Sequence, residues 1–175
     1  MPSVVPNTRI SNEKKNLYRL AGEFLVASRL TQRGYMVSLQ WGSTISYDLL
    51  VFDKQGNVAY IEVKTTGSYP RRWILQRKHA EPEADAIPLR QRFVCCVDLT
   101  TRAGEPVVYV LPAAVVARGL RYFFQKGFPQ SPSLHLSLDF RPSILGPTSK
   151  TVGEHIEAEG YREAYDGLGV QRLAG

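Results

Sequence analysis

Apolar residues recur every three to four positions along the first well-patterned segment of the chain. Ser11 is a candidate N-cap, and Gly34 is a residue type that commonly follows the last helical turn. The pattern therefore predicts a helix from about residue 12 to Gln32. At about 100° per residue, one arc of that helix collects Leu17, Leu20, Ala21, Phe24, Ala27 and Leu30. Glu23 falls inside the same arc.

Shorter runs rich in β-branched and aromatic residues follow, and they predict strands over residues 35–41, 47–53 and 57–65. Lys54-Gln55-Gly56 separates the last two runs. A three-residue hairpin loop needs a left-handed conformation at its last position, which Gly56 adopts readily. This turn pairs Asp53 with Asn57 and therefore places Asp48 opposite Glu62. Directly opposed residues of an antiparallel pair have Cβ atoms about 5 Å apart.

The later part of the chain has a less regular pattern. Residues 71–81 indicate either a short helix or an irregular basic segment. Further strands are expected over 92–99, 106–111 and 134–140, with a turn around Gly104 between the first two. Pro112 suits the first turn of a helix that reaches about Lys126, and a last helix is expected over 153–166.

The composition bounds the class of protein. The 175 residues are 43% hydrophobic, which is enough for a core and argues against wholesale disorder. We expect an N-terminal arm over 1–10, a folded domain over 11–128, and an extension over 129–175 packed on or tethered to that domain. The formal charge of +6 favours a polyanionic partner, nucleic acid before membrane. No apolar stretch suits a signal peptide or a membrane span, so a cytoplasmic protein is predicted.

The cysteines and histidines give no sign of a zinc site. Cys95 and Cys96 are adjacent on a predicted strand, so their side chains point to opposite faces and a mutual disulfide is not expected. They suit buried positions in a reducing compartment. There is no Cys-x-x-Cys pair, and His79, His135 and His155 are scattered.

Carboxylates and one lysine mark the candidate site. Glu62 and Lys64 share a strand face, and the hairpin register adds Asp48 beside them. Each feature alone has a structural alternative, since Glu-x-Lys on a strand is usually a solvated face or a weak ion pair. Together, the like charges need a neutralising cation, so we predict a Mg²⁺ or Mn²⁺ site. Asp48, Glu62 and the carbonyl of Val63 are the expected ligands, and Glu23 is expected to hold a second metal or a water linked to the first.

Such a site suggests hydrolysis of a phosphodiester. A divalent ion polarises a phosphate oxygen and acidifies a bound water, while Lys64 positions that water and offsets charge on the phosphate. Basic residues just beyond the site, with one aromatic residue among them, suit phosphate contacts: Arg71, Arg72, Trp73, Arg77 and Lys78. The alternatives are a solvated basic loop and, for Trp73, a place in the core. Gln76 or Lys78 is a candidate extra polar group in the active site, and His79 has no evident partner.

Three short segments resemble the PD-(D/E)XK nuclease superfamily: Gly22-Glu23, Tyr47-Asp48 and Ile61-Glu62-Val63-Lys64. The chain looks most like archaeal Holliday junction resolvases and uncharacterised bacterial relatives of restriction endonucleases, over about residues 11–118. Tyr47 stands where the namesake motif has proline. The resemblance implies an α/β fold, a restriction endonuclease-like αβββαβ core with a central mixed sheet flanked by helices. It also implies metal-dependent DNA cleavage, with a catalytic set of Glu23, Asp48, Glu62 and Lys64.

The leading hypothesis is therefore a Mg²⁺-dependent deoxyribonuclease. It would be an endonuclease, and structured or junction DNA is among its candidate substrates. The first alternative is a non-cleaving nucleic-acid-binding module on the same fold, and the second is a structural subunit that uses the fold as a scaffold. The helix after Pro112 carries apolar residues that suit either the core or the interface of a homodimer: Val115, Val116, Leu120, Phe123 and Phe124.

Overall fold

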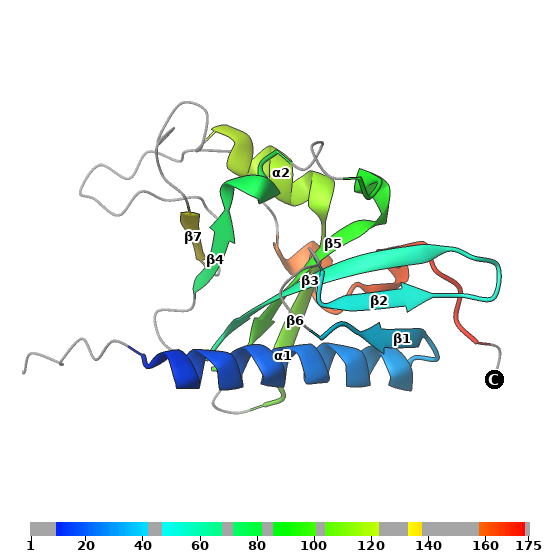
Figure 1. Ribbon diagram of the computed structural model, residues 1–175, viewed down its shortest axis with the longest axis horizontal. Coiled ribbons are helices and arrows are strands. Elements are labelled where there is room, and N and C mark those ends of the chain that lie inside the picture. The colour runs from blue at the N-terminus through cyan, green and yellow to red at the C-terminus, as the bar shows by residue number, and fades with distance from the viewer. Residues whose placement is uncertain are drawn as a thin grey trace, which may run out of the picture.

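A mixed five-stranded sheet organises the protein, with helices on its two faces (Figure 1). The computed structural model describes residues 10–41, 47–67, 72–81, 86–100, 104–122, 133–137 and 158–173. The sheet has the order β1-β2-β3-β5-β6, and β4 pairs with β7 in a second sheet. The elements are α1 (Asn12–Gln32), β1 (Met36–Leu39), β2 (Leu49–Phe52), β3 (Val58–Thr66), β4 (Arg72–Gln76), η1 (Arg77–His79), η3 (Leu89–Gln91), β5 (Arg92–Asp98), β6 (Val107–Pro112), α2 (Ala113–Tyr122), β7 (Ser133–Ser137), η5 (Ala158–Tyr161) and η6 (Tyr165–Leu168). The predicted α/β class with a central mixed sheet flanked by helices is confirmed.

Helix α1 has the predicted bounds and caps. Ser11 Oγ accepts a hydrogen bond from the backbone N–H of Lys14, and Gly34 has a φ of 85° just beyond the C-cap. The predicted apolar arc, however, is only partly the buried face. The side that faces the sheet consists of Gly22, Glu23, Val26, Ala27 and Leu30. Leu17 and Phe24 are exposed instead.

A close approach between α1 and β3 explains this rotation. A Cβ atom at Gly22 would overlap Thr65 Oγ1, so only glycine allows the helix to lie this near the strand. One turn earlier, the ring of Tyr18 lies where a Cβ at Gly67 would be. These contacts turn Gly22 and Glu23 towards the sheet, and Phe24 therefore faces solvent.

The hairpin of β2 and β3 has the predicted register. Leu50 pairs with Tyr60 and Phe52 with Val58, and Gly56 has a φ of 85° in the loop. The Asp53 N–H donates to the Asn57 carbonyl at 3.1 Å and closes the ladder. The turn chemistry was therefore sufficient to align the two strands.

Two apolar layers lie on the two faces of the sheet. One layer joins α1 to the face that carries Leu49, Val51, Ile61 and Val63, and the other includes Leu111, Val116 and Leu120 beside β4. Cys95 belongs to the first layer and Cys96 to the second, as the strand alternation predicted. Among the described helices, none is long and apolar enough to cross a bilayer.

The connection from β3 to its parallel neighbour β5 differs from the expected helix or irregular segment. Its described residues form the strand β4 and the single turns η1 and η3, where the expected core has an α-helix. Trp73 and Leu75 are buried while Ile74 and Gln76 are exposed. This two-residue alternation is that of a strand, and β7 supplies the partner from far along the chain.

Helix α2 begins directly after Pro112, as predicted, and buries Val116 and Leu120 in the second layer. Phe123 and Phe124, expected on the same helix, lie outside the described residues, as do Lys126 and the second half of the strand predicted over 134–140. The described part of α2 therefore supports the core alternative for two of its apolar positions.

Residues 158–173 pass the β6 edge of the sheet, where Arg162 pairs with Tyr109, and then reach the end of α1. Tyr165, Leu168 and Val170 join the first apolar layer, and the backbone N–H of Leu173 donates to the Gly34 carbonyl at 2.7 Å. The helix predicted over 153–166 is wrong for the described residues, which form the short turns η5 and η6. Glu163 separates these turns with a φ of 52°, a conformation that an α-helix does not contain.

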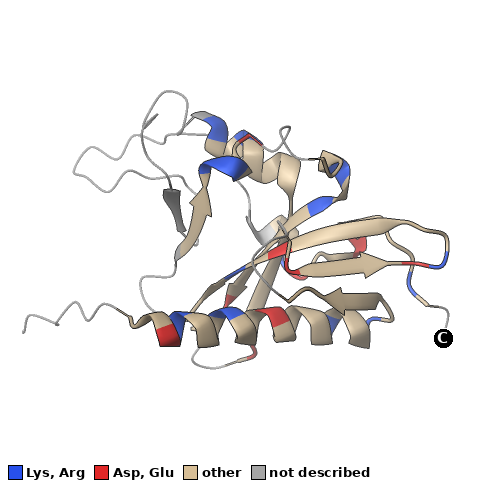
Figure 2. Ribbon diagram, viewed as in Figure 1, with Lys and Arg blue, Asp and Glu red and all other residues tan. Residues whose placement is uncertain are grey.

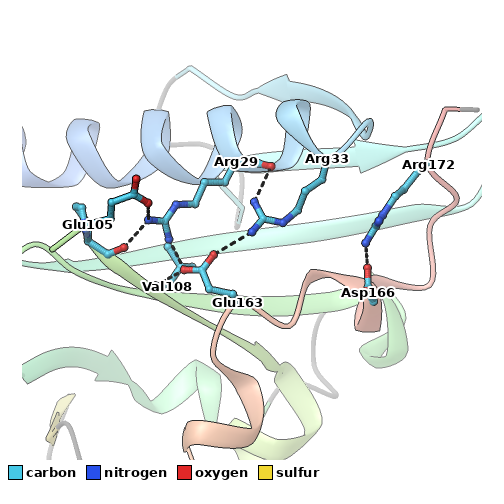
Figure 3. A network of polar contacts seen from close by, with 8 residues as sticks. Arg29, Arg33, Glu105, Val108, Glu163, Asp166 and Arg172 are labelled. Atoms are coloured by element: carbon cyan, nitrogen blue, oxygen red, sulfur yellow. Dashed lines mark hydrogen bonds and ion pairs between the residues drawn. The ribbon is translucent and has the colours of Figure 1, made fainter. Parts of the chain in front are cut away.

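A network around Glu163 fastens this segment (Figure 3). Its carboxylate is paired with the guanidinium groups of Arg29 and Arg33 and accepts the Val108 N–H at 3.0 Å. Its own N–H donates to the Val108 carbonyl at 2.8 Å. Arg29 also donates to the Pro106 carbonyl. The end of the described chain is thereby tied to α1 and β6.

Candidate active site

The hairpin brings Asp48 to the side of the middle of β3. The Asp48 N–H donates to the Ile61 carbonyl at 2.8 Å, and Asp48 Oδ2 accepts the Val63 N–H at 2.6 Å. The Asp48 carbonyl in turn accepts the Gln40 N–H at 2.9 Å. The carboxylate is thus held at the point where the regular β2–β3 ladder ends.

Glu62 forms the centre of a group of cations. Its Oε1 lies 2.6 Å from Lys64 Nζ and 3.1 Å from Lys78 Nζ. Its Oε2 lies 3.0 Å from His79 Nε2. The Glu62 side chain is 12% exposed and that of His79 only 4%. Strand β3 supplies Glu62 and Lys64, while η1 supplies Lys78 and His79.

The charges around Glu62 set its protonation state. Burial by itself would raise the pKa of this carboxyl, but the hydrogen bond and charge of His79 and the charge of Lys64 outweigh it. The pKa of Glu62 is therefore held below its ordinary value. The carboxylate stays ionised and available as an acceptor throughout the neutral range.

Glu23 and Asp48 show the opposite behaviour. Burial raises the pKa of Glu23, the charge of Asp48 raises it further, and Arg19 at 2.6 Å lowers it in part. Burial likewise raises the pKa of Asp48, against the Val63 hydrogen bond, and the charge of Glu62 adds to the rise. Asp48 therefore lies electrostatically between the other two acids, and negative charge at this place is unfavourable without a cation.

The three acids form a row rather than a closed cluster. Within the ranges that the structure describes, no three His, Cys, Asp or Glu side chains come close enough together to hold one metal ion. The Asp48 carboxylate accepts the Val63 N–H, one residue after Glu62, and it is coupled electrostatically to both Glu62 and Glu23. Two carboxylates and a carbonyl are sufficient for Mg²⁺, which usually retains several waters.

A hollow opens next to Glu62 on the side of α2. The space of about 370 Å³ includes open solvent at the mouth, and the part comparable to a closed cavity is only about 20 Å³. Tyr47, Tyr60, Glu62, His79 and Arg92 are the polar residues among those that line it. The rings of Tyr47 and Tyr60 meet edge to face at 4.9 Å between centroids. Polar groups from several elements therefore surround an opening that leads to the Glu62 carboxylate.

The residues proposed to bind nucleic acid fall into different environments. Lys78, a candidate extra polar group of the active site, contacts Glu62. Arg77 pairs with Glu81 at 3.7 Å. Arg71 and the side chain of Arg72 lie outside the described part of the chain. Figure 2 shows further basic residues along α1.

Trp73 belongs to the core. Its side chain is 1% exposed, its Nε1–H donates to the Val97 carbonyl at 2.9 Å, and its ring packs edge to face against Tyr109. No ring face is left for a nucleobase, so stacking by Trp73 is corrected in favour of the alternative. The reason is that β4 turns Trp73 towards the sheet, where the sequence indicated a helix or an irregular segment.

The sequence analysis did not predict the contacts of His79 with Glu62 and of Arg19 with Glu23. The backbone of Gln76 holds the His79 ring through Nδ1 and directs Nε2 to Glu62, a contact made by a crossover that periodicity did not predict. Arg19 lies four residues before Glu23, and this spacing was a usable signal for an ion pair on a helix.

Comparisons with known proteins add little. No protein-family model matches the chain, and no curated protein matches it. Among solved structures, the chain is similar to the bacterial homing endonuclease I-Ssp6803I, with 17% identity over 90% of this chain and 91% of the other. The TM-score is 0.47. The functional argument therefore depends on the side chains described above.

Proposed function

We propose that this protein is a metal-dependent endonuclease that hydrolyses phosphodiester bonds in DNA. The observation that carries the proposal is the set of Glu23, Asp48 and Glu62. Burial disfavours the anionic forms of Glu23 and Asp48, and the charge of Asp48 adds to this at Glu23 and that of Glu62 at Asp48. A divalent cation relieves that cost, and hard oxygen ligands are the donors that Mg²⁺ and Mn²⁺ prefer. The residues present therefore fit such an ion.

Asp48, Glu62 and the carbonyl of Val63 would hold the ion, with Glu23 at the edge of its surroundings. The ion would supply Lewis-acid polarisation of the phosphate and a more acidic water. The chain itself supplies the positioning. Asp48 is fixed by the Val63 N–H, and Glu62 is kept ionised by its basic neighbours.

Lys64 and Lys78 are proposed to act on the phosphate. Both ammonium groups contact one oxygen of Glu62 and are partly exposed, so they can turn to a phosphate that enters the site. Lys64 would orient the attacking water and offset the negative charge that develops on the phosphate. Arg77 and Lys78, on η1, would contact the phosphate backbone without reading sequence.

DNA is the proposed substrate, and the net positive charge of the chain favours a polyanionic partner. The chain has a net charge of +6, and basic side chains flank the acidic row from both η1 and α1. The resemblance of Gly22-Glu23, Tyr47-Asp48 and Glu62-Val63-Lys64 to the PD-(D/E)XK superfamily supports DNA cleavage in particular. A cytoplasmic location and a homodimer that cuts two strands belong to the same proposal.

A cleavage assay with matched variants tests this function. Supercoiled plasmid, linear duplex and a four-way junction are incubated with the protein in Mg²⁺, Mn²⁺ or EDTA. We expect cleavage that requires the metal and is lost in Asp48→Asn and Glu62→Gln. Glu13→Gln is the control, because it removes an exposed acid of the same helix that carries Glu23.

The alternatives give different results in the same assay. Binding that weakens steeply with salt, without any cleavage, would establish a non-cleaving nucleic-acid-binding module. Neither binding nor cleavage would leave the structural subunit. Cleavage that persists in both Asp48→Asn and Glu62→Gln would refute the site and point to a contaminating nuclease.

A further inference from the structure

Two aromatic side chains lie in solvent beside the acidic row. Trp41 is 72% exposed and Phe24 is 48% exposed. Their ring centroids are 6.2 Å apart and the planes are tilted by 58°. Large aromatic groups are usually buried, and exposed apolar surface of this kind often marks a binding site.

The backbone connects this pair to the proposed catalytic acids. Phe24 directly follows Glu23 on α1. Trp41 directly follows Gln40, whose N–H donates to the Asp48 carbonyl at 2.9 Å. A ligand that covers the two rings therefore lies next to the α1 end of the acidic row.

The charges on the helix that carries Phe24 restrict the class of ligand. Lys14, Lys15 and Arg19 lie on the N-terminal half of α1, against one exposed acid, Glu13. A partner that offers flat apolar groups together with negative charge is complementary to this surface. A second copy of the chain is not, because it would bring two basic helices together.

We propose that Trp41 and Phe24 form a stacking platform for unpaired bases of single-stranded DNA beside the active site. Bases stack on aromatic side chains with little regard to sequence, while their phosphates contact basic groups. The choice of DNA rests on the proposed function. Bases inside a continuous duplex are already stacked on one another, so the platform selects DNA with a single-stranded segment next to the cleavage position.

Tryptophan fluorescence tests the contact directly. The chain has two tryptophans, and Trp73 is buried in the core. A single-stranded 20-mer titrated into the wild type in EDTA is expected to quench the emission to saturation and to protect it from iodide. Trp41→Phe should remove this signal. Unchanged Trp41 emission at saturating single-stranded DNA would overturn the proposal.

Affinities of variants provide the second test. Trp41→Ala and Phe24→Ala should each weaken binding of the 20-mer about 5- to 150-fold, whereas Trp41→Phe should retain most of the affinity. Binding of a blunt duplex should change less than about twofold. Leu17→Ala is the control, since Leu17 is exposed on the same helix and has no ring.

Two outcomes would refute the platform. One is an equal loss of affinity for the blunt duplex and the single strand. The other is a dimer in sedimentation that Trp41→Ala dissociates, because the rings would then form a contact between two copies. Metal-dependent cleavage together with either result would refute the platform alone. Stacking without any cleavage would refute the nuclease and leave the platform intact.

Discussion

Two glutamates of this protein lie among basic groups, and only one of them is placed to meet a ligand. Glu163 is paired with Arg29 and Arg33, and Glu62 with Lys64, Lys78 and His79. Both clusters join segments far apart in the sequence. They differ in the type of basic side chain and in how far those side chains are exposed to solvent.

In the Glu163 cluster, other residues of the protein bind the carboxylate. Planar guanidinium groups hold the carboxylate, the backbone of Val108 exchanges two hydrogen bonds with Glu163, and the Arg29 side chain is only 11% exposed (Figure 3). In the Glu62 cluster, the Lys64 and Lys78 side chains are 25% and 44% exposed and can be redirected. Arginine at a fixed site suits structure, while flexible lysines beside a hollow suit a ligand.

The largest expected effect separates the two glutamates by activity. Glu62→Gln should lower the rate of DNA cleavage about 100- to 1,000-fold, because it removes a carboxylate on which the metal and the cations are positioned. Its free energy of unfolding should also fall, because the Glu62 side chain is only 12% exposed and the buried His79 loses its charged partner. Plasmid cleavage and urea denaturation measure the two quantities. A large loss of stability with normal specific activity would reverse the roles that we assign.

Glu163→Gln should affect stability alone. Removing the partner of two partly buried arginines should lower the free energy of unfolding by about 2 kcal/mol, reduced from the usual cost because the Glu163 side chain is 29% exposed. The specific activity of the folded protein should be unchanged. Urea denaturation followed by circular dichroism measures the effect. Glu105→Gln is the control, because that side chain is 93% exposed, and it should cost less than about 0.5 kcal/mol.

Stabilisation of the protein by a divalent metal should depend on pH at the candidate site and should not depend on the Glu163 cluster. Raised pKa values of Glu23 and Asp48 mean that the folded state binds these protons more tightly than the unfolded chain does. The contribution of these two carboxyl groups to stability without metal therefore falls as the pH rises from their ordinary pKa values through the raised ones. Mg²⁺ at about ten times its dissociation constant should restore about 1.4 kcal/mol.

Thermal unfolding with and without Mg²⁺ measures this effect. The metal-induced shift should grow as the pH rises over that same interval, because protonated carboxyl groups do not ligate the ion. The shift should disappear in Asp48→Asn and persist in Glu163→Gln. An equal shift in all three proteins would show that Mg²⁺ binds elsewhere.

The smallest expected effect is on stability, and it comes from comparing Arg19 with Arg29 on α1. Arg19→Gln should change the free energy of unfolding by less than about 0.5 kcal/mol, because the Arg19 side chain is 55% exposed. It should also raise the pKa of Glu23 further, since Arg19 lowers it in the wild type. Carbon-13 NMR titration of the Glu23 carboxyl measures the shift. Arg29→Gln should be clearly more destabilising, and equal effects would remove the distinction between the clusters.

Local rules in the sequence determined much of the fold. A capping serine and Gly34 bounded α1, and Gly56 aligned β2 with β3 so that Asp48 came beside the middle of β3. The two-residue alternation separated Cys95 from Cys96. Each prediction used interactions between residues near in sequence, for which turn geometry and periodicity are sufficient.

Only the tertiary structure decided which faces are buried and which distant groups meet. Thr65 selects the face of α1 through the space it leaves at Gly22, and β7 makes a strand of residues 72–76. His79 reaches Glu62, and Glu163 reaches Arg29, across long stretches of chain. Close packing and charge pairing between segments that are remote in sequence leave no periodic trace, so they emerge only when the chain is folded.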